Sequence, residues 1–283
     1  MENNITSFEE YKEEYAKSIN QPEQFWEEKA NNFIWQKKWD KVLSWDFLKP
    51  EIKWFEGGRL NITENCLDRH LEIKGNQTAI KWIPNEPSEE SRSISYTELH
   101  SDVCKFSNVL KNNGAKKGDR ICIYMPMVPE LVIAVLACAR IGAIHSVVFA
   151  GFSAKALSDR INDADCNILI TADGGFRGAK ITPLKDISDM AMRTTPSIEK
   201  CIVLERTKNT ISMKNGRDVW LHDEILKVSA NCPVEIMDAE APLFILYTSG
   251  STGKPKGIQH STAGYMIYTE YSFRNVFQYN EGD

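Results

Sequence analysis

The densest group of residues that could take part in chemistry lies in one short stretch, residues 248–257, which reads TSGSTGKPKG. The stretch contains four hydroxyl side chains, three glycines and two lysines, and it follows the apolar run 244–247. Glycines let the backbone turn its N–H groups toward one point, and such converging N–H groups bind phosphate. A simple turn needs only one or two residues of this kind. The stretch therefore predicts a phosphate-binding loop.

The residues around the lysine decide which class of phosphate loop this is. The loop of the common nucleoside triphosphatases reads G-x-x-x-x-G-K-[ST], and the hydroxyl after its lysine binds magnesium. Here Gly250 and Gly253 are closer together, and Pro255 follows Lys254. Proline offers neither a side-chain ligand nor an N–H, and it favours an extended Lys254, so the loop cannot continue directly into a helix. A phosphate-loop ATPase or kinase is therefore disfavoured.

The unbroken string from Tyr247 to Gly257 resembles the phosphate loop of adenylate-forming enzymes: acyl-CoA synthetases, luciferases and peptide-synthetase adenylation domains. Further segments resemble the acetyl-CoA synthetase (AMP-forming acetate–CoA ligase) family: WFEGGRLN, NCLDRH, IYMPMVPELVIAVLACARIGAIHSVVFAGFSAKAL and ITAD with RGAK. The resemblance extends over nearly the whole chain and corresponds to the N-terminal part of that family. Propionate and acetoacetate enzymes share much of the pattern, although residues 66–70 and the long apolar block favour the acetate or propionate branch.

The resemblance implies a two-step reaction. Acetate attacks the α-phosphorus of ATP to give acetyl-AMP and pyrophosphate, and the thiol of coenzyme A then displaces AMP to give acetyl-CoA. The first step needs positive charge and N–H donors around the departing pyrophosphate, together with magnesium that arrives with ATP. By resemblance, the ATP phosphates are held by Thr248, Ser249, Gly250, Ser251, Thr252, Gly253 and Lys254.

A second stretch, residues 174–180, aligns with the family's coenzyme A segment and implies binding by Arg177, Gly178, Ala179 and Lys180. Coenzyme A carries a 3′-phosphate and a diphosphate, for which arginine offers a fork of donors and lysine a point charge. Without the family, a solvated basic loop is the simpler interpretation. The resemblance also implies that the backbone at Gly151 approaches the thiol-bearing arm.

Several kinds of catalytic constellation are not discernible in the sequence. There are no paired carboxylates, no Ser/His/Asp triad and no His/Cys cluster with metal-ligand spacing. His145 has the pattern of a core histidine near a strand end, and His260 could cap the helix that follows it. We therefore assign no catalytic residue and expect no metal site built by the protein.

Composition limits the class of protein. The chain has 283 residues, is 42% hydrophobic and carries a net charge of −5, so it lacks a basic field for nucleic acid or an anionic membrane. Arg140 interrupts the most apolar region, 131–154, after nine residues, so no uninterrupted apolar run there is long enough for a membrane span. Seven isolated cysteines and an N-terminus without a targeting pattern indicate a reduced, cytoplasmic protein. The oligomeric state stays open.

The elements that must position these residues alternate between strand and helix. The pattern predicts strands at 78–83, 120–124, 144–149, 167–171, 200–204 and 243–247, and helices at 130–141, 154–161, 186–192 and 263–273. A capping box, Ser95 to Glu98, opens another helix that Gly114 ends, and a further helix is expected at 63–71. The prediction is an α/β fold with largely parallel sheets flanked by helices, in which ligands bind beyond the carboxyl ends of the strands.

The predicted organisation has two parts. Residues 1–62, rich in aromatic residues, form an N-terminal segment of short helices that wrap the body, and residues 63–283 form the N-terminal part of an AMP-binding (adenylation) domain. In the family, the adenosine contacts, the acid pocket and a mobile C-terminal domain lie after the position of Asp283, so we expect these residues alone to be inactive. Two alternatives stay open: a propionyl or other short-chain acyl-CoA synthetase, and a non-catalytic fragment that binds nucleotide or coenzyme A.

Overall fold

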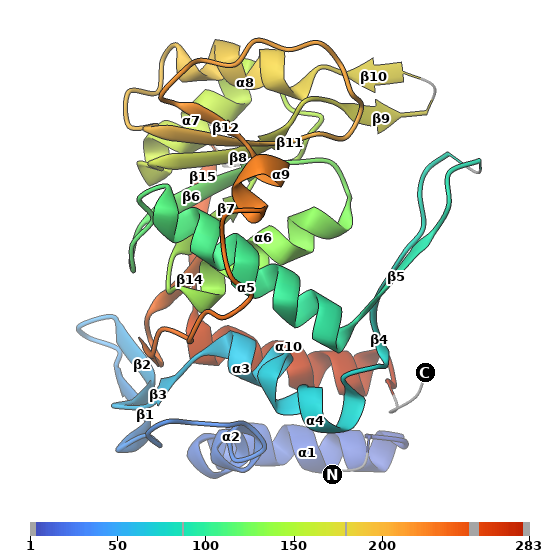
Figure 1. Cartoon of the computed structure of the whole chain (residues 1–283). Helices are drawn as coiled ribbons and strands as arrows, with labels where there is room; N and C mark the ends of the chain where they lie inside the picture. Colours follow the sequence, from blue (N-terminus) through green and yellow to red (C-terminus); the bar gives the residue numbers. More distant parts are fainter. Residues whose placement is uncertain (1–3, 87, 179, 249–254, 280–283) are drawn as a thin grey trace. The chain divides into compact units, whose positions relative to one another are not determined.

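A computed structural model describes residues 4–86, 88–178, 180–248 and 255–279 (Figure 1). The chain folds as two compact units. The first combines Met1–Asn65, Ile236–Ala241 and His260–Asp283, and the second combines Cys66–Glu235 with Pro242–Gln259. Each unit has its own hydrophobic core.

The second unit is built on the central sheet. In spatial order its strands are β12 (Asp218–Trp220), β11 (Lys200–Leu204), β8 (Ile168–Ala172), β6 (Arg120–Tyr124), β7 (Ile144–Val147), β14 (Pro242–Thr248) and β15 (Lys256–Ser261), of which β15 extends into the first unit. Every neighbouring pair from β12 to β14 is parallel. The predicted parallel α/β fold is confirmed, and β14 ends where the predicted phosphate loop begins.

The sheet is covered on both faces, and the alternation of side chains along β6 shows why. Ile121 and Ile123 pack into one core with α5 (Tyr96–Asn112), α6 (Pro129–Arg140) and α9 (Leu221–Ile225). Cys122 and Tyr124 pack into the opposite core with α7 (Ala154–Ala164) and α8 (Leu184–Met192). A strand buried on both faces requires an unbroken apolar run, which is what made these strands predictable.

Local signals at helix ends were also read correctly. Ser95 and Glu98 form the predicted capping box at the start of α5, with each side chain bonded to the other residue's backbone N–H. Gly114, just after the helix, has a φ of +96°, which glycine adopts without strain. The α10 helix (Thr262–Val276) confirms the predicted one, but Ser261 occupies its N-cap position rather than His260.

One predicted helix was wrong, and three strands were missed. The helix expected at 63–71 is divided into α3 (Ile62–Cys66), a 3₁₀ turn and α4 (Leu71–Lys74), because Leu67 leaves the helical conformation at φ −126°. The second unit also contains two antiparallel hairpins that project from it (Figure 1), β4 (Thr78–Trp82) with β5 (Arg92–Ser95) and β9 (Gly175–Arg177) with β10 (Lys180–Thr182). Of these four strands, only β4 was expected.

The first unit corrects the prediction of short helices throughout its N-terminal part. It has two helices, α1 (Phe8–Asn20) and α2 (Pro22–Ala30), but the next segment is an antiparallel hairpin of β1 (Lys41–Asp46) and β2 (Glu51–Glu56). A short pair, β3 (Arg59–Leu60) with β13 (Met237–Asp238), follows. Four tryptophans, Trp26, Trp35, Trp39 and Trp54, pack into an aromatic cluster within this unit; for example, the rings of Trp35 and Trp39 lie 4.9 Å apart.

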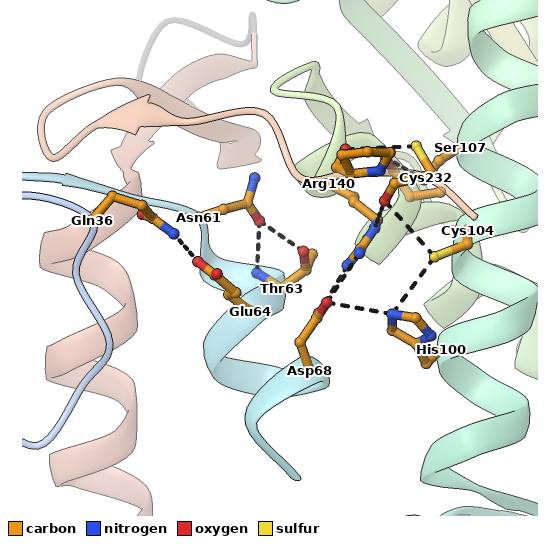
Figure 2. Close-up of polar contacts among 12 residues, drawn as sticks. Gln36, Asn61, Thr63, Glu64, Asp68, His100, Cys104, Ser107, Arg140 and Cys232 are labelled. Carbon is orange, nitrogen blue, oxygen red and sulfur yellow. Dashed lines mark hydrogen bonds and ion pairs between the residues drawn. The ribbon is translucent and has the colours of Figure 1, made fainter. Parts of the chain in front are cut away.

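The NCLDRH segment is joined to α6 by a largely buried ion pair (Figure 2). Arg140, only 4% exposed, donates to both carboxylate oxygens of Asp68, at 2.8 and 3.0 Å, and through Nε to the carbonyl of Cys232 at 2.6 Å. His100 Nε2 lies 3.3 Å from the same carboxylate. Burial acts to raise the pKa of Asp68, but the hydrogen bonds and charge of Arg140 and His100 hold it below its usual value. Asp68 therefore stays ionised and compensates the arginine that interrupts the apolar block.

The described part of the chain has free cysteines only: six are buried, and Cys66 is exposed. Among the described helices, none combines the length and the apolar character needed to cross a bilayer.

His145 lies inside the sheet, as the sequence predicted for a core histidine. Its ring stacks on Phe244 of the neighbouring strand, with centroids 5.5 Å apart, and its Nδ1 lacks a hydrogen-bond partner among the described residues. Burial lowers the pKa of His145 to about 4. The native protein therefore keeps this imidazole neutral at pH values where an unfolded chain would protonate it.

We predict that His145 makes the protein sensitive to acid. Below pH ~6.5 the unfolded state binds a proton that the native state does not, so this site should remove about 3 kcal/mol of unfolding free energy by pH ~4. In His145→Phe, which keeps a ring against Phe244, the loss should disappear. Urea unfolding at several pH values measures it, with exposed His222→Phe as the control. Identical pH profiles for wild type and His145→Phe would contradict the prediction.

Candidate functional site

Three connecting segments begin at the same edge of the sheet. They follow β7, β8 and β14, and because these strands and β6 run parallel, their carboxyl ends point the same way. These segments are residues 148–153, the β9–β10 hairpin with the residue before it, and the stretch after Thr248. Loops at the carboxyl edge of a parallel sheet are where ligands bind in open α/β folds.

The predicted phosphate loop is described only at its two ends. Thr248 is exposed at the end of β14, and Lys256 and Gly257 are exposed at the start of β15. The predicted phosphate ligands Ser249, Gly250, Ser251, Thr252, Gly253 and Lys254 lie outside the described residues. The structure thus places the two flanks of the stretch on adjacent strands of the sheet.

Tyr247 occupies a crowded position at the end of β14. Its hydroxyl donates to Asp163 Oδ2 at 2.7 Å, and burial together with this carboxylate raises its pKa. A methyl group added to Gly257 would lie 3.2 Å from the Tyr247 ring, which is closer than a side chain ordinarily packs. Glycine at 257 therefore allows β15 to lie close against this tyrosine.

The segment after β7 is fixed by a buried tyrosine. The Tyr124 hydroxyl lies 2.7 Å from the carbonyl of Phe152 and 3.1 Å from that of Ala150. Burial raises the pKa of Tyr124 to about 12, so the hydroxyl stays protonated and remains a donor. Gly151, between the two carbonyls, is exposed, and a Cβ there would meet the Phe149 ring at 2.4 Å. The turn thus presents bare backbone at Gly151.

The predicted coenzyme A stretch forms the β9–β10 hairpin. Arg177 and Lys180 are cross-strand partners, and both are exposed. Within the described residues, neither side chain pairs with a carboxylate. Gly178 takes the turn with a φ of +57°, and Ala179 lies outside the described residues. The hairpin therefore brings two positive charges together at its tip.

A fully buried carboxylate holds the base of this hairpin. Asp173 accepts hydrogen bonds from the backbone N–H groups of Gly174, Arg206, Thr207 and Asn209 at 2.7–3.2 Å. Backbone donors rather than a side-chain cation thus stabilise the buried charge. Asp173 ties the start of the hairpin to the segment after β11.

The segment that Asp173 holds also carries an arginine that packs on the hairpin. The Arg206 guanidinium carbon lies 4.9 Å from the ring centroid of Phe176 and 5.4 Å from that of Trp82. Its Nη2 pairs with Glu89 Oε2 at 2.6 Å. Such contacts between a cation and aromatic rings stabilise by about 0.5–2 kcal/mol, depending on exposure. The β9 strand of the hairpin is therefore stabilised by the packing of Phe176 against Arg206, which also contacts Trp82.

Comparison of the sequence with models of protein families identifies the family of this chain. The sequence model described as "AMP-binding enzyme" matches residues 67–283, which is most of the chain. The chain belongs to the AMP-binding enzyme family. The model described as "Acetyl-coenzyme A synthetase N-terminus" matches residues 11–66 in addition.

Individual relatives are similar to this chain over almost its whole length. The chain is 53% identical over 274 residues to a protein of Bdellovibrio bacteriovorus named acetyl-coenzyme A synthetase, covering 96% of this chain and 42% of the relative. It is 51% identical to acetyl-coenzyme A synthetase 2 of Pseudomonas aeruginosa, covering 97% and 43%. The chain thus spans less than half the length of these relatives.

A solved structure shows the same fold. The acetoacetyl-CoA synthetase of Streptomyces lividans superimposes with a TM-score of 0.86 at 24% identity, over 95% of this chain and 41% of that protein. At this identity the similarity supports the fold of the AMP-binding enzyme and not a particular substrate.

Three residues that shape the edge were not singled out from the sequence: Tyr124, Asp173 and Arg206. Asp173 alone left a signal, because it ends the ITAD segment that was read as a family pattern. Its partners are backbone N–H groups, three of them more than 30 residues away in the chain. Contacts of this kind leave no pattern of side-chain types or spacing in the sequence.

We predict that Asp173→Asn loosens the hairpin. An asparagine amide must direct its own N–H groups toward backbone donors, so the change should cost about 2–3 kcal/mol of unfolding free energy. It should also speed hydrogen exchange most strongly at residues 175–182. Exposed Asp165→Asn is the matched control and should change either quantity little. Unchanged exchange in the hairpin would contradict the prediction.

Proposed function

We propose that the complete polypeptide that carries these residues, called the full-length protein below, is an AMP-forming acetate–CoA ligase. The observation that carries the proposal is the uninterrupted string from Tyr247 to Gly257, found in a chain that matches the AMP-binding family over 67–283 and proteins named acetyl-CoA synthetase over nearly all its length. The substrates are acetate, ATP and coenzyme A.

In the first step the acetate oxygen bonds to the α-phosphorus and pyrophosphate leaves. We propose that Thr248, Ser249, Gly250, Ser251, Thr252, Gly253 and Lys254 hold the phosphates through hydroxyl, backbone N–H and ammonium donors. The two described flanks lie on adjacent strands, which suits a loop that surrounds a polyanion. Magnesium would enter with the triphosphate, whose oxygens are the ligands it prefers, and would neutralise charge on the leaving group.

In the second step the thiol of coenzyme A attacks the acetyl carbon and AMP leaves. We propose that Arg177, Gly178, Ala179 and Lys180 bind the nucleotide end of coenzyme A, and that the bare backbone at Gly151 borders its arm. Two exposed cations at one hairpin tip suit a phosphate. Asp173 and Arg206 would position the hairpin without touching the ligand.

The remaining expectations belong to the same proposal. Residues 1–62 would form the N-terminal segment, and 63–283 the N-terminal part of the adenylation domain. The protein would act in the cytoplasm on small molecules. Assaying the full-length protein with acetate and propionate in parallel separates the two acids, which these residues do not distinguish.

We predict that Lys254→Ala or Thr252→Ala in the full-length protein slows adenylate formation about 10- to 100-fold, because one charge-assisted contact to the departing pyrophosphate is lost. Thioester formation from supplied acetyl-AMP should change far less, since that step expels no pyrophosphate. Acetate-dependent pyrophosphate exchange measures the first step, and exposed Lys227→Ala is the control. Equal slowing of both steps would refute the assignment.

We also predict that residues 1–283 alone do not make acetyl-CoA. Rate acceleration requires the phosphates, the adenosine and the acid to be held together, and only the phosphate and coenzyme A segments are recognisable here. A purified polypeptide of residues 1–283, incubated with acetate, ATP, magnesium and coenzyme A, should release no AMP above a no-enzyme control. Acetate-dependent AMP release at about one per second per chain, within the usual enzyme range, would show that the site is elsewhere.

A further inference from the structure

One side chain lies between the two segments that the proposed function assigns to different steps. Arg160 is in α7, and its guanidinium carbon lies 4.7 Å from the ring centroid of Phe152 and 5.4 Å from that of Tyr247. Phe152 belongs to the turn that contains Gly151, and Tyr247 directly precedes the phosphate loop. Arg160 also donates through Nη1 to the carbonyl of Ala156 at 2.7 Å, which fixes its side chain along its own helix.

In the segment assigned to coenzyme A, Arg160 contacts Phe152, whose ring packs closely against a second ring of the Gly151 turn. Phe152 meets Phe149 edge to face at 5.6 Å, and the Phe149 ring lies beside Gly151, where an added Cβ would meet it. The hydroxyl of Tyr124 holds the backbone of the same turn. A shift of Phe152 would therefore move the exposed backbone at Gly151.

In the segment assigned to ATP, Arg160 contacts Tyr247, which precedes the phosphate loop and also packs against the strand that follows the loop. Its ring contacts Arg160 and also lies against Gly257, while its hydroxyl bonds to Asp163 on the same helix as Arg160. A Cβ at Gly257 would lie only 3.2 Å from the Tyr247 ring, so the ring packs closely against the backbone of β15. The position of Tyr247 is thus set by α7 and by β15 together.

We infer that Arg160 is a positioning residue that couples the described flanks of the phosphate loop to the Gly151 turn, so that each step of the reaction depends on the geometry of the other step's segment. This inference rests on the proposed function. Arg160 itself touches neither reacting group. Its guanidinium is attracted to both rings, and this attraction holds Phe152 and Tyr247 at one fixed separation.

The test changes a residue in one segment and measures the reaction step that is assigned to the other segment. In the full-length protein, Phe152→Leu should slow acetate-dependent pyrophosphate exchange, measured without coenzyme A, about three- to tenfold. Tyr247→Phe, which removes the bond to Asp163, should slow thioester formation from supplied acetyl-AMP by a similar factor. Each of these is a cross-effect: a change in one segment slows the step assigned to the other segment. Both cross-effects should shrink below about twofold when the same changes are made in Arg160→Met, because the contact of Arg160 with the two rings is then already lost. Arg160→Lys should restore part of them.

Arg120→Met is the matched control, because Arg120 also binds the end of α7, through the carbonyl of Ala164 and the carboxylate of Asp165, but from the amino end of β6. It should leave both cross-effects intact, whereas general loosening of α7 would abolish them in Arg120→Met as well. Thermal unfolding of every variant separates lost stability from lost coupling. Absent cross-effects, or cross-effects that persist in Arg160→Met, would overturn the inference. A wild-type protein without acetate-dependent exchange would instead overturn the proposed function and this inference with it.

Discussion

The burial of β6 on both faces is the constraint on which the rest of the second unit depends. The side chains of Ile121, Cys122 and Ile123 alternate between the two cores, so none of these positions is free for polar chemistry. Polar groups can therefore act only where the strands end. Tyr124, the last residue of β6, shows the transition: its ring belongs to the core, while its hydroxyl fixes the turn after β7.

The same constraint explains how charge is distributed at that edge. Asp173 follows a fully buried strand and is itself buried, and it is compensated by backbone donors. A negative charge satisfied in this way leaves the cationic side chains of the hairpin unneutralised. Arg206 and Arg160 contact aromatic rings, which stabilise a guanidinium without consuming all of its hydrogen-bond donors, and Arg206 also pairs with Glu89.

Sequence reasoning succeeded where one physical signal dominated. The bounds of β6 and β11 were predicted to the residue, because a strand buried on both faces must be apolar throughout. It failed for the β1–β2 hairpin, where aromatic and charged residues suit a helix as well as a half-exposed strand. The β15 strand was missed because most of it is exposed and shows no alternation.

The candidate site was predicted to a similar extent. Its motifs could be found because glycine, hydroxyl and basic residues are adjacent in the chain. The supporting contacts of Asp173 and Arg160 could not, because they join backbone groups and rings from distant segments. Such contacts exist only once the sheet has brought the segments together.

The placement of the tryptophans has a consequence for optical experiments. Five of the seven indoles, Trp26, Trp35, Trp39, Trp45 and Trp54, belong to the first unit, so the intrinsic fluorescence of this protein reports mainly on that unit. Of the two in the second unit, Trp82 contacts the Arg206 guanidinium that also covers Phe176 of the β9–β10 hairpin. With the other six indoles replaced by phenylalanine, the emission of Trp82 would become a reporter of events at that hairpin.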